Sequence, residues 1–142
     1  FYACWPDCHV GPTVTLTRDG GGTTISTAIA SDNSFGFDNV PEGAYTISVN
    51  AAGFMRAERQ GLMVDGNSIS MPDIELRGGE VNGDEVGNIL DISAMAASFA
   101  SHLPDRVDEF GRFVDSNADG VVNILDLTTA ASNFGTTEPL VW

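Results

Sequence analysis

The chain has 142 residues, which is enough for one ordinary domain or two small ones. Its 42% hydrophobic content is sufficient for packed cores and argues against wholesale disorder. The formal net charge of -14 argues against nucleic acid and anionic membranes as partners, because the protein would repel phosphates. No apolar run approaches the roughly 20 residues that span a bilayer, so no membrane insertion is expected.

The only two cysteines, Cys4 and Cys8, lie in an N-terminal segment of residues 1–10. Three intervening residues, one of them a proline, allow a small disulfide loop, which suits an oxidising compartment. Free thiols are the alternative, and a lone pair without further cysteines or a nearby histidine is a poor zinc site. Because no signal peptide is present, we expect a mature, trimmed or internal fragment. The expected location is extracellular or at the cell surface, which suits a disulfide.

Residues 11–77 have the pattern of β-structure. Residues 13–17 alternate between polar and apolar side chains and end at the glycine-rich turn of residues 20–22. Further strands are expected at residues 24–30, 45–49, 61–64 and 74–76. Because short strands separated by frequent turns are typical of antiparallel sandwiches, we expect a small β-sandwich here.

Part of this region resembles a known family. Residues 34–47 read S-F-G-F-D-N-V-P-E-G-A-Y-T-I, and the turn Ala52-Gly53-Phe54 follows. This segment resembles the carboxypeptidase regulatory-like, or prealbumin-like, family, which implies a non-catalytic β-sandwich that serves as a stalk, spacer or adhesive unit. The family usually opens with a G-x-V-x-D strand, which residues 1–9 do not show. Either that strand lies upstream or a partner supplies it.

A twelve-residue pattern occurs twice, at residues 80–91 and 115–126. In both copies oxygen-bearing side chains occupy positions 1, 3, 5, 9 and 12, and a valine occupies position 7. This spacing suits a hard cation, because a tight loop turns alternate side chains inward and position 7 offers its backbone carbonyl. Like charges packed this closely destabilise the metal-free state, which favours a bound cation.

An amphipathic helix is expected after each loop. In the first helix Ile89, Ile92, Met95, Ala96 and Phe99 share one face. In the second helix the shared face holds Ile124, Leu127, Ala131 and Phe134. Only Gly78-Gly79 separates the loops from the β-region, so the two parts are expected to pack against each other.

Residues 80–135 resemble a dockerin, the duplicated calcium-loop-plus-helix module of bacterial extracellular assemblies. Each loop is followed directly by one helix, and neither loop has the preceding helix of an EF-hand. The resemblance implies one Ca²⁺ ion in each loop. The side-chain ligands it implies are Asp115, Asn117, Asp119, Asn123 and Asp126, and in the first loop Glu80, Asn82, Asp84, Asn88 and Asp91. The backbone carbonyls it implies are those of Val121 and Val86.

The first loop departs from the dockerin pattern twice. Glu80 replaces the usual aspartate and lengthens the arm. Glu85 replaces the glycine of position 6, where a left-handed backbone is often required. We therefore expect the first site to be weaker or distorted.

Dockerins bind cohesins through residues near positions 10 and 11 of each loop. These positions hold Ile89, Leu90, Ile124 and Leu125, where the best-known dockerins often carry small hydroxyl residues. They are therefore candidate residues for binding a cohesin-like partner. Core packing and a buried interface against the sandwich are the alternatives.

The predicted fold class is two small domains. An all-β prealbumin-like (Ig-like) sandwich at residues 11–77 precedes an α-helical dockerin-like domain with two calcium loops at 80–135, and an extended tail covers 136–142.

The predicted function is a non-catalytic, calcium-stabilised assembly module that attaches to another protein. Catalysis is not expected, because no nucleophile elbow, zinc-protease motif or phosphate-binding glycine loop occurs in the sequence. An alternative is a subunit that polymerises with neighbouring copies into an extracellular filament, by strand donation across an open sandwich edge. A third possibility is carbohydrate adhesion through aromatic side chains such as Tyr2, Trp5 or Phe54.

Overall fold

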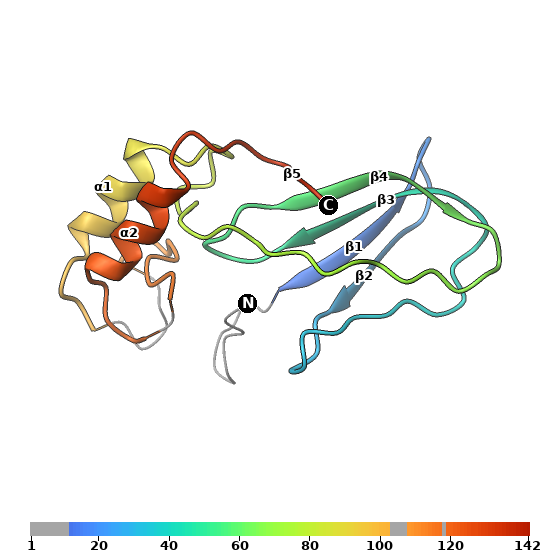
Figure 1. The fold of residues 1–142 in the computed structure, drawn as a ribbon, viewed down its shortest axis with the longest axis horizontal. Helices are drawn as coiled ribbons and strands as arrows, with labels where there is room; N and C mark the ends of the chain where they lie inside the picture. Colours follow the sequence, from blue (N-terminus) through green and yellow to red (C-terminus); the bar gives the residue numbers. More distant parts are fainter. Residues whose placement is uncertain (1–11, 103–107, 118) are drawn as a thin grey trace.

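A computed structural model describes residues 12–102, 108–117 and 119–142. Its strands form one five-stranded sheet in the order β2-β1-β3-β4-β5 (Figure 1). The strands are β1 (Thr13–Arg18), β2 (Thr24–Ala28), β3 (Gly43–Asn50), β4 (Ala57–Val64) and β5 (Leu140–Val141). All neighbours pair antiparallel except β4 and β5, which are parallel. The helices α1 (Ile89–Ala97) and α2 (Ile124–Ser132) lie together beyond one end of the sheet (Figure 1).

One face of the sheet is apolar and the other is polar, as alternating side chains require. Val14 of β1 pairs with Val49 of β3, and both side chains are buried. On the opposite face, the hydroxyls of Thr15 and Ser26 lie 3.0 Å apart in a hydrogen bond. The alternation in the sequence therefore correctly predicts β1 and β3 and the face that each buries.

Two irregular segments, residues 29–42 and 65–77, cover the apolar face. The second runs back along the sheet toward the helices (Figure 1). Phe35, Phe37 and Met71 pack from these segments against the core that Val14 and Tyr45 anchor. The expected strand at residues 74–76 is not a strand. The second layer consists of loops, so the expected sandwich is absent from the described residues.

The predicted fold class is therefore wrong. Residues 12–102, 108–117 and 119–142 are mostly β, with a single sheet and two short helices of nine residues each. It is not a β-sandwich domain followed by a helical domain, because β5 returns from beyond α2 to pair with β4 at Ala57↔Leu140 and Glu58↔Val141. Local sequence patterns carry no information about such a pairing between distant segments.

The end of the expected extended tail, residues 140–142, thus lies on the sheet of its own chain. The Leu140 N–H donates to the Arg56 carbonyl at 2.8 Å, and the Trp142 N–H donates to the Glu58 carbonyl at 3.1 Å. Strand donation to a neighbouring copy stays a prediction, and this tail would first have to leave β4.

The loop region packs directly on the sheet region through glycines. A Cβ atom at Gly79 would lie 2.5 Å from Ala130 Cα, and one at Gly87 would lie 2.6 Å from Met55 Cε. Met55 is fully buried at this junction. The Asn133 side chain of the segment after α2 donates to the Gly78 carbonyl at 2.8 Å. The loop region and the sheet region therefore pack against each other, as the two-residue linker Gly78-Gly79 predicts. Neither described helix is long and apolar enough to cross a membrane.

Candidate metal-binding loops and the adjacent helix faces

Each helix begins with a capping box that is also part of the repeated loop. The Asn88 side chain accepts from the Leu90 N–H at 2.7 Å, and the Asp91 side chain accepts from the Asn88 N–H at 2.8 Å. In α2, Asn123 and Asp126 form the same capping box. Loop positions 9 and 12 therefore fix the first turn of each helix, since they satisfy N–H groups that have no partner inside the helix.

The carboxylates at position 12 are fully buried and close the loops. Asp91 Oδ1 accepts from the Val81 N–H at 2.9 Å and from the Asn82 N–H at 3.3 Å. Asp126 Oδ1 accepts from the Ser116 N–H at 2.8 Å in the same way. A buried carboxylate requires such donors, because desolvation of an unpaired charge is costly. Each aspartate thus ties the start of its loop to the start of its helix.

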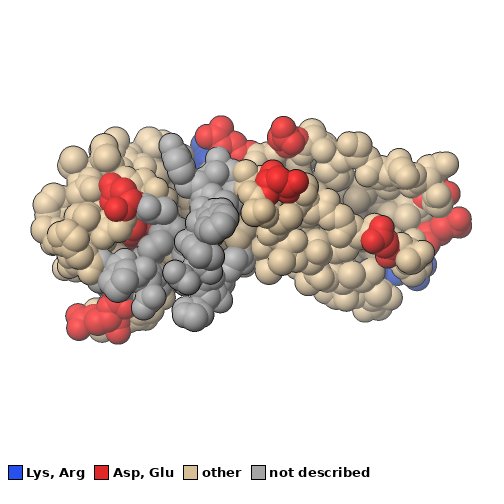
Figure 2. All heavy atoms as spheres, turned by 90° about the horizontal axis from the view of Figure 1, so that it is seen from below, with Lys and Arg blue, Asp and Glu red and all other residues tan. Residues whose placement is uncertain are grey.

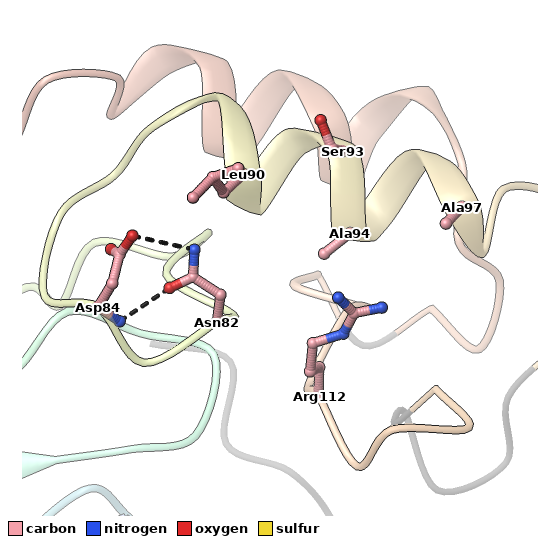
Figure 3. A pocket seen from close by; sticks show the side chains of 7 residues that line it. All are labelled: Asn82, Asp84, Leu90, Ser93, Ala94, Ala97 and Arg112. Atoms are coloured by element: carbon pink, nitrogen blue, oxygen red, sulfur yellow. Dashed lines mark hydrogen bonds between the residues drawn. The ribbon is translucent and has the colours of Figure 1, made fainter.

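In the first loop, polar groups converge on the carboxylate of Asp84. Asp84 Oδ2 accepts from Asn82 Nδ2 at 3.2 Å and from Asn88 Nδ2 at 2.9 Å, and Asn88 Nδ2 also donates to the Val86 carbonyl at 2.9 Å. Figure 3 shows the contact between Asn82 and Asp84. The hydrogen bond from Asn88 is the main cause of a lowered pKa of Asp84.

The second loop repeats this network residue for residue. Asp119 Oδ2 accepts from Asn117 Nδ2 at 2.9 Å and from Asn123 Nδ2 at 3.1 Å. Asn123 Nδ2 also donates to the Val121 carbonyl at 3.2 Å. The pKa of Asp119 is lowered, first by the N–H of Val121 and then by Asn117. The two loops therefore share one local structure as well as one sequence pattern.

The donor set of both loops fits calcium. It consists of carboxylates, amide oxygens and a backbone carbonyl, the oxygen ligands that Ca²⁺ takes. The asparagine N–H groups point at the same acidic oxygens that a cation would draw together. A bound cation would compete with these N–H groups for the same carboxylate oxygens.

At position 1 of the first loop, Glu80 is buried. Its Oε1 accepts from the Gly83 N–H at 2.8 Å and from the Asp84 N–H at 3.2 Å. Burial raises the pKa of Glu80, and the negative charges of Asp91 and Glu138 add to the effect of burial. Carboxylate oxygens of Glu80, Asp84 and Asp91 all lie within 4.8 Å of one another. A cation among them would remove the repulsion that these groups share.

Each loop also pairs with the segment that follows the other loop's helix. Val86 forms a bridge with Thr137, beyond α2, and Val121 forms one with His102, beyond α1. The N–H of the buried Val122 donates to the Ser101 carbonyl at 3.0 Å. This reciprocal pairing fixes the two loops relative to each other. Sequence reasoning missed it, because single bridges leave no periodic pattern.

The helices bury only part of the predicted faces. Met95 is fully buried, Ala94 and Ala130 are nearly so, and Ile92 and Leu127 pack beside them. The predicted faces had also included two phenylalanines, Phe99 and Phe134, which are 51% and 58% exposed. That part of the prediction is wrong, because the capping aspartates turn inward and direct their own side of each helix into the core.

The residues at loop positions 10 and 11 are exposed. Their exposed fractions are 59% for Ile89, 59% for Leu90, 62% for Ile124 and 57% for Leu125. Core packing and a buried interface within the chain are therefore both wrong for these four side chains. Two matched apolar pairs face solvent beside the two acidic loops.

A shallow depression of about 490 Å³ lies along α1 beside the first pair. It is lined by Asn82, Asp84, Leu90, Ser93, Ala94, Ala97 and Arg112. Figure 3 shows Leu90, Ala94 and Ala97 on the helix above, with the Arg112 side chain reaching up from below. Arg112 is held by Asp108, whose Oδ2 lies 2.6 Å from Arg112 Nε. A partner docked on Leu90 would reach this depression as well.

The protein as a whole is acidic, with a formal net charge of -14. Figure 2 shows Asp and Glu side chains spread over the face in view, with few Lys or Arg. This charge favours a neutral or basic partner surface over an acidic one.

Cys4 and Cys8, and the aromatic residues Tyr2 and Trp5, lie outside the described residues. Phe54 packs half-buried against the sheet core.

The fold has counterparts among solved structures. They include two crystal structures of the type II cohesin-X-dockerin complex from Acetivibrio cellulolyticus, one a C-terminal and one an N-terminal interface mutant. In each, a chain superposes with a TM-score of 0.67 at 24% sequence identity, over 90% of this chain and 83% of that chain. The fold is shared. No protein-family model matches the sequence, and no curated protein matches it.

This likeness bears on the predicted fold class. One superposition spans nearly the whole chain, so the sheet and the loop region belong together in a shared, mostly β fold. That finding, with the return of β5 to the sheet, replaces the expected succession of a sandwich and a helical domain.

Proposed function

We propose that this chain is a non-catalytic, extracellular protein-attachment module, stabilised by calcium, whose partner is a protein of the cohesin kind. The structural likeness to chains from a type II cohesin-X-dockerin complex supports a role in protein assembly. The tandem loops support a place for this chain on the dockerin side of such a complex.

The observation that carries the proposal is the exposure of two apolar pairs on a strongly acidic protein. Exposed apolar groups that cluster within a polar rim are typical of protein-binding surfaces. Here the rim is formed by the carboxylates and amides of the loops. The proposed contact residues are Ile89, Leu90, Ile124 and Leu125.

Calcium would stabilise this surface indirectly. The residues that would hold it in the first loop are Glu80, Asn82, Asp84, Val86, Asn88 and Asp91, and in the second Asp115, Asn117, Asp119, Val121, Asn123 and Asp126. Because positions 9 and 12 also cap the helices, ion binding would fix the first turn, which carries the apolar pair at positions 10 and 11.

The experiment is isothermal titration calorimetry of the full chain against a purified type II cohesin, in calcium and in EDTA. We expect binding in calcium and its loss in EDTA. The double variant Leu90→Asp with Leu125→Asp should lose binding while keeping its circular dichroism spectrum. Met63→Asp is the matched control, because Met63 is 63% exposed on β4, away from the loops.

A parallel titration against an X-dockerin protein tests whether this chain takes the place of the dockerin or of the cohesin in such a complex. Binding to the X-dockerin in place of the cohesin would contradict the dockerin-side assignment. Undiminished cohesin binding by the double variant would contradict the proposed surface.

A further inference from the structure

A larger cavity, of about 1030 Å³, lies between the sheet and the segments that cover it. Its floor is the apolar face of β1, β3 and β4, with Val14, Ile47 and Leu62 among its lining residues. Its walls come from residues 32–40 and 66–74 and from Trp142. Ligand sites in proteins usually measure about 300–1,000 Å³, so this cavity has the size of a binding site.

One wall of the cavity is a fixed group of three aromatic rings. The ring of Phe35 meets Phe37 edge-on, with centroids 6.2 Å apart, and meets Trp142 edge-on at 5.7 Å. The indole N–H of Trp142 donates to the Pro72 carbonyl at 2.9 Å, which fixes that ring. All three rings are only half-buried, so part of each remains available for contact.

The rim of the cavity is polar and carries no positive charge. Its side chains include the carboxylates of Asp32, Asp38 and Asp73 and the amides of Asn39 and Asn67, all exposed. Hydrogen bonds from Ser34 lower the pKa of Asp32, so it accepts hydrogen bonds as a carboxylate at neutral pH. Lys, Arg and His are absent from the described lining, which argues against an anionic ligand.

We propose that this cavity binds a neutral oligosaccharide. A sugar ring has an apolar C–H face, which packs on aromatic and aliphatic side chains, and hydroxyl edges, which bond to carboxylates and amides. The wall of Phe35 and Trp142 supplies the first surface, and the rim of Asp38, Asn39 and Asp73 supplies the second. This site is separate from the calcium loops and the exposed apolar pairs, so it requires neither a metal ion nor a protein partner.

Other ligand classes fit these groups less well. A wholly apolar ligand would leave the carboxylates and amides of the rim without hydrogen bonds at the point where they lose water. An organic cation is best held by ring faces arranged around it, whereas these three rings meet edge to face and enclose no such cage.

The test is calorimetric titration of the full chain, in calcium, with neutral hexasaccharides of β-linked glucose, xylose or mannose. Tetramethylammonium chloride serves as the cationic probe. Trp142→Ala removes one aromatic ring. The double variant Asp38→Ala with Asp73→Ala changes only exposed rim groups and so leaves the sheet core intact. Val141→Ala is the matched control, because Val141 is 94% exposed and does not line the cavity.

We expect at least one hexasaccharide to bind, and expect both the Trp142→Ala and the rim variant to weaken it by about tenfold or more. Val141→Ala should bind as the wild type does. The proposal is overturned if no hexasaccharide binds at about 1 mM, if only tetramethylammonium binds, or if the rim variant binds sugar unchanged.

Discussion

Glu85 and Gly120 occupy the same position of the two loops and adopt the same left-handed backbone, with φ angles of 66° and 85°. Glycine takes this conformation without steric cost, whereas the Cβ of a glutamate crowds the following carbonyl. The carbonyl of Glu85 accepts from the Glu138 N–H at 2.9 Å. Contact with the returning C-terminal segment thus holds the first loop in the conformation that glycine gives the second.

Glu85→Gly should therefore stabilise the protein. Relief of the left-handed strain is worth about 1 kcal/mol, part of which is offset by the greater freedom of glycine in the unfolded chain. Thermal unfolding in calcium is the measurement. Glu85→Ala is the control, because it removes the same carboxylate and keeps the Cβ. Equal stabilisation by both variants would show that charge, and not backbone strain, is responsible.

Asp91→Ala should destabilise the protein by about 3 kcal/mol, because it leaves three buried or half-buried N–H groups without their acceptor. Asp126→Ala should cost a similar amount, since Asp126 has the same three contacts. Urea unfolding in EDTA measures the loss of unfolding free energy that comes from these hydrogen bonds alone, because no metal is bound. An effect visible only in calcium would mean that the aspartates act as ligands alone.

Glu138 connects the returning segment to the sheet. Its Oε1 accepts from the Arg56 N–H at 2.8 Å, and its Oε2 lies 3.5 Å from Arg56 Nε. Glu138→Ala should cost about 1–2 kcal/mol, because the side chain is almost fully buried and leaves the Arg56 N–H unpaired. Hydrogen exchange should then speed up first at Leu140 and Trp142. Unchanged exchange there would contradict a role for Glu138 in holding β5.

The pair of Asp108 and Arg112 predicts a pH dependence. Burial acts to raise the pKa of Asp108, but hydrogen bonds from Arg112 and from the Phe110 N–H outweigh it and lower the pKa below its usual value of about 4. The contribution to stability is therefore present above pH 4 and is lost as pH falls through the lowered pKa. Asp108→Asn should cost about 1 kcal/mol at pH 7.

The measurement is the difference in unfolding free energy between wild type and Asp108→Asn from pH 7 down to pH 2. Taking the difference removes the common effect of protonating the loop carboxylates. A difference that stays constant over this range would contradict the lowered pKa.

Local features were predictable from the sequence. The alternation at residues 13–17 and 45–49 predicts β1 and β3, since one face of each strand is buried. The repeated loop predicts the start of both helices, because Asn88 and Asn123 are caps as well as candidate ligands. These features depend on residues close together in the chain.

Features that depend on distant segments were not predictable. Nothing local to Leu140 indicates a parallel pairing with Ala57, and nothing near Phe35 shows that a loop will replace a second sheet. The sequence named Leu90 as a candidate contact residue but left core packing open, because an apolar residue in an amphipathic helix is ordinarily assigned to the core. The Leu90 side chain points to solvent because the neighbouring cap Asp91 is buried, and only the structure shows that burial.

The central claim is that calcium stabilises the loops that present the apolar pairs. It is tested most directly by thermal unfolding of the full chain, followed by circular dichroism at 222 nm, in excess calcium, in magnesium and in EDTA. Occupation of two sites at about 100 times their dissociation constants should raise the melting temperature by about 10 °C or more over EDTA. Magnesium should give a smaller shift, because it favours octahedral sites with several waters. Identical melting temperatures in calcium and EDTA would contradict the account.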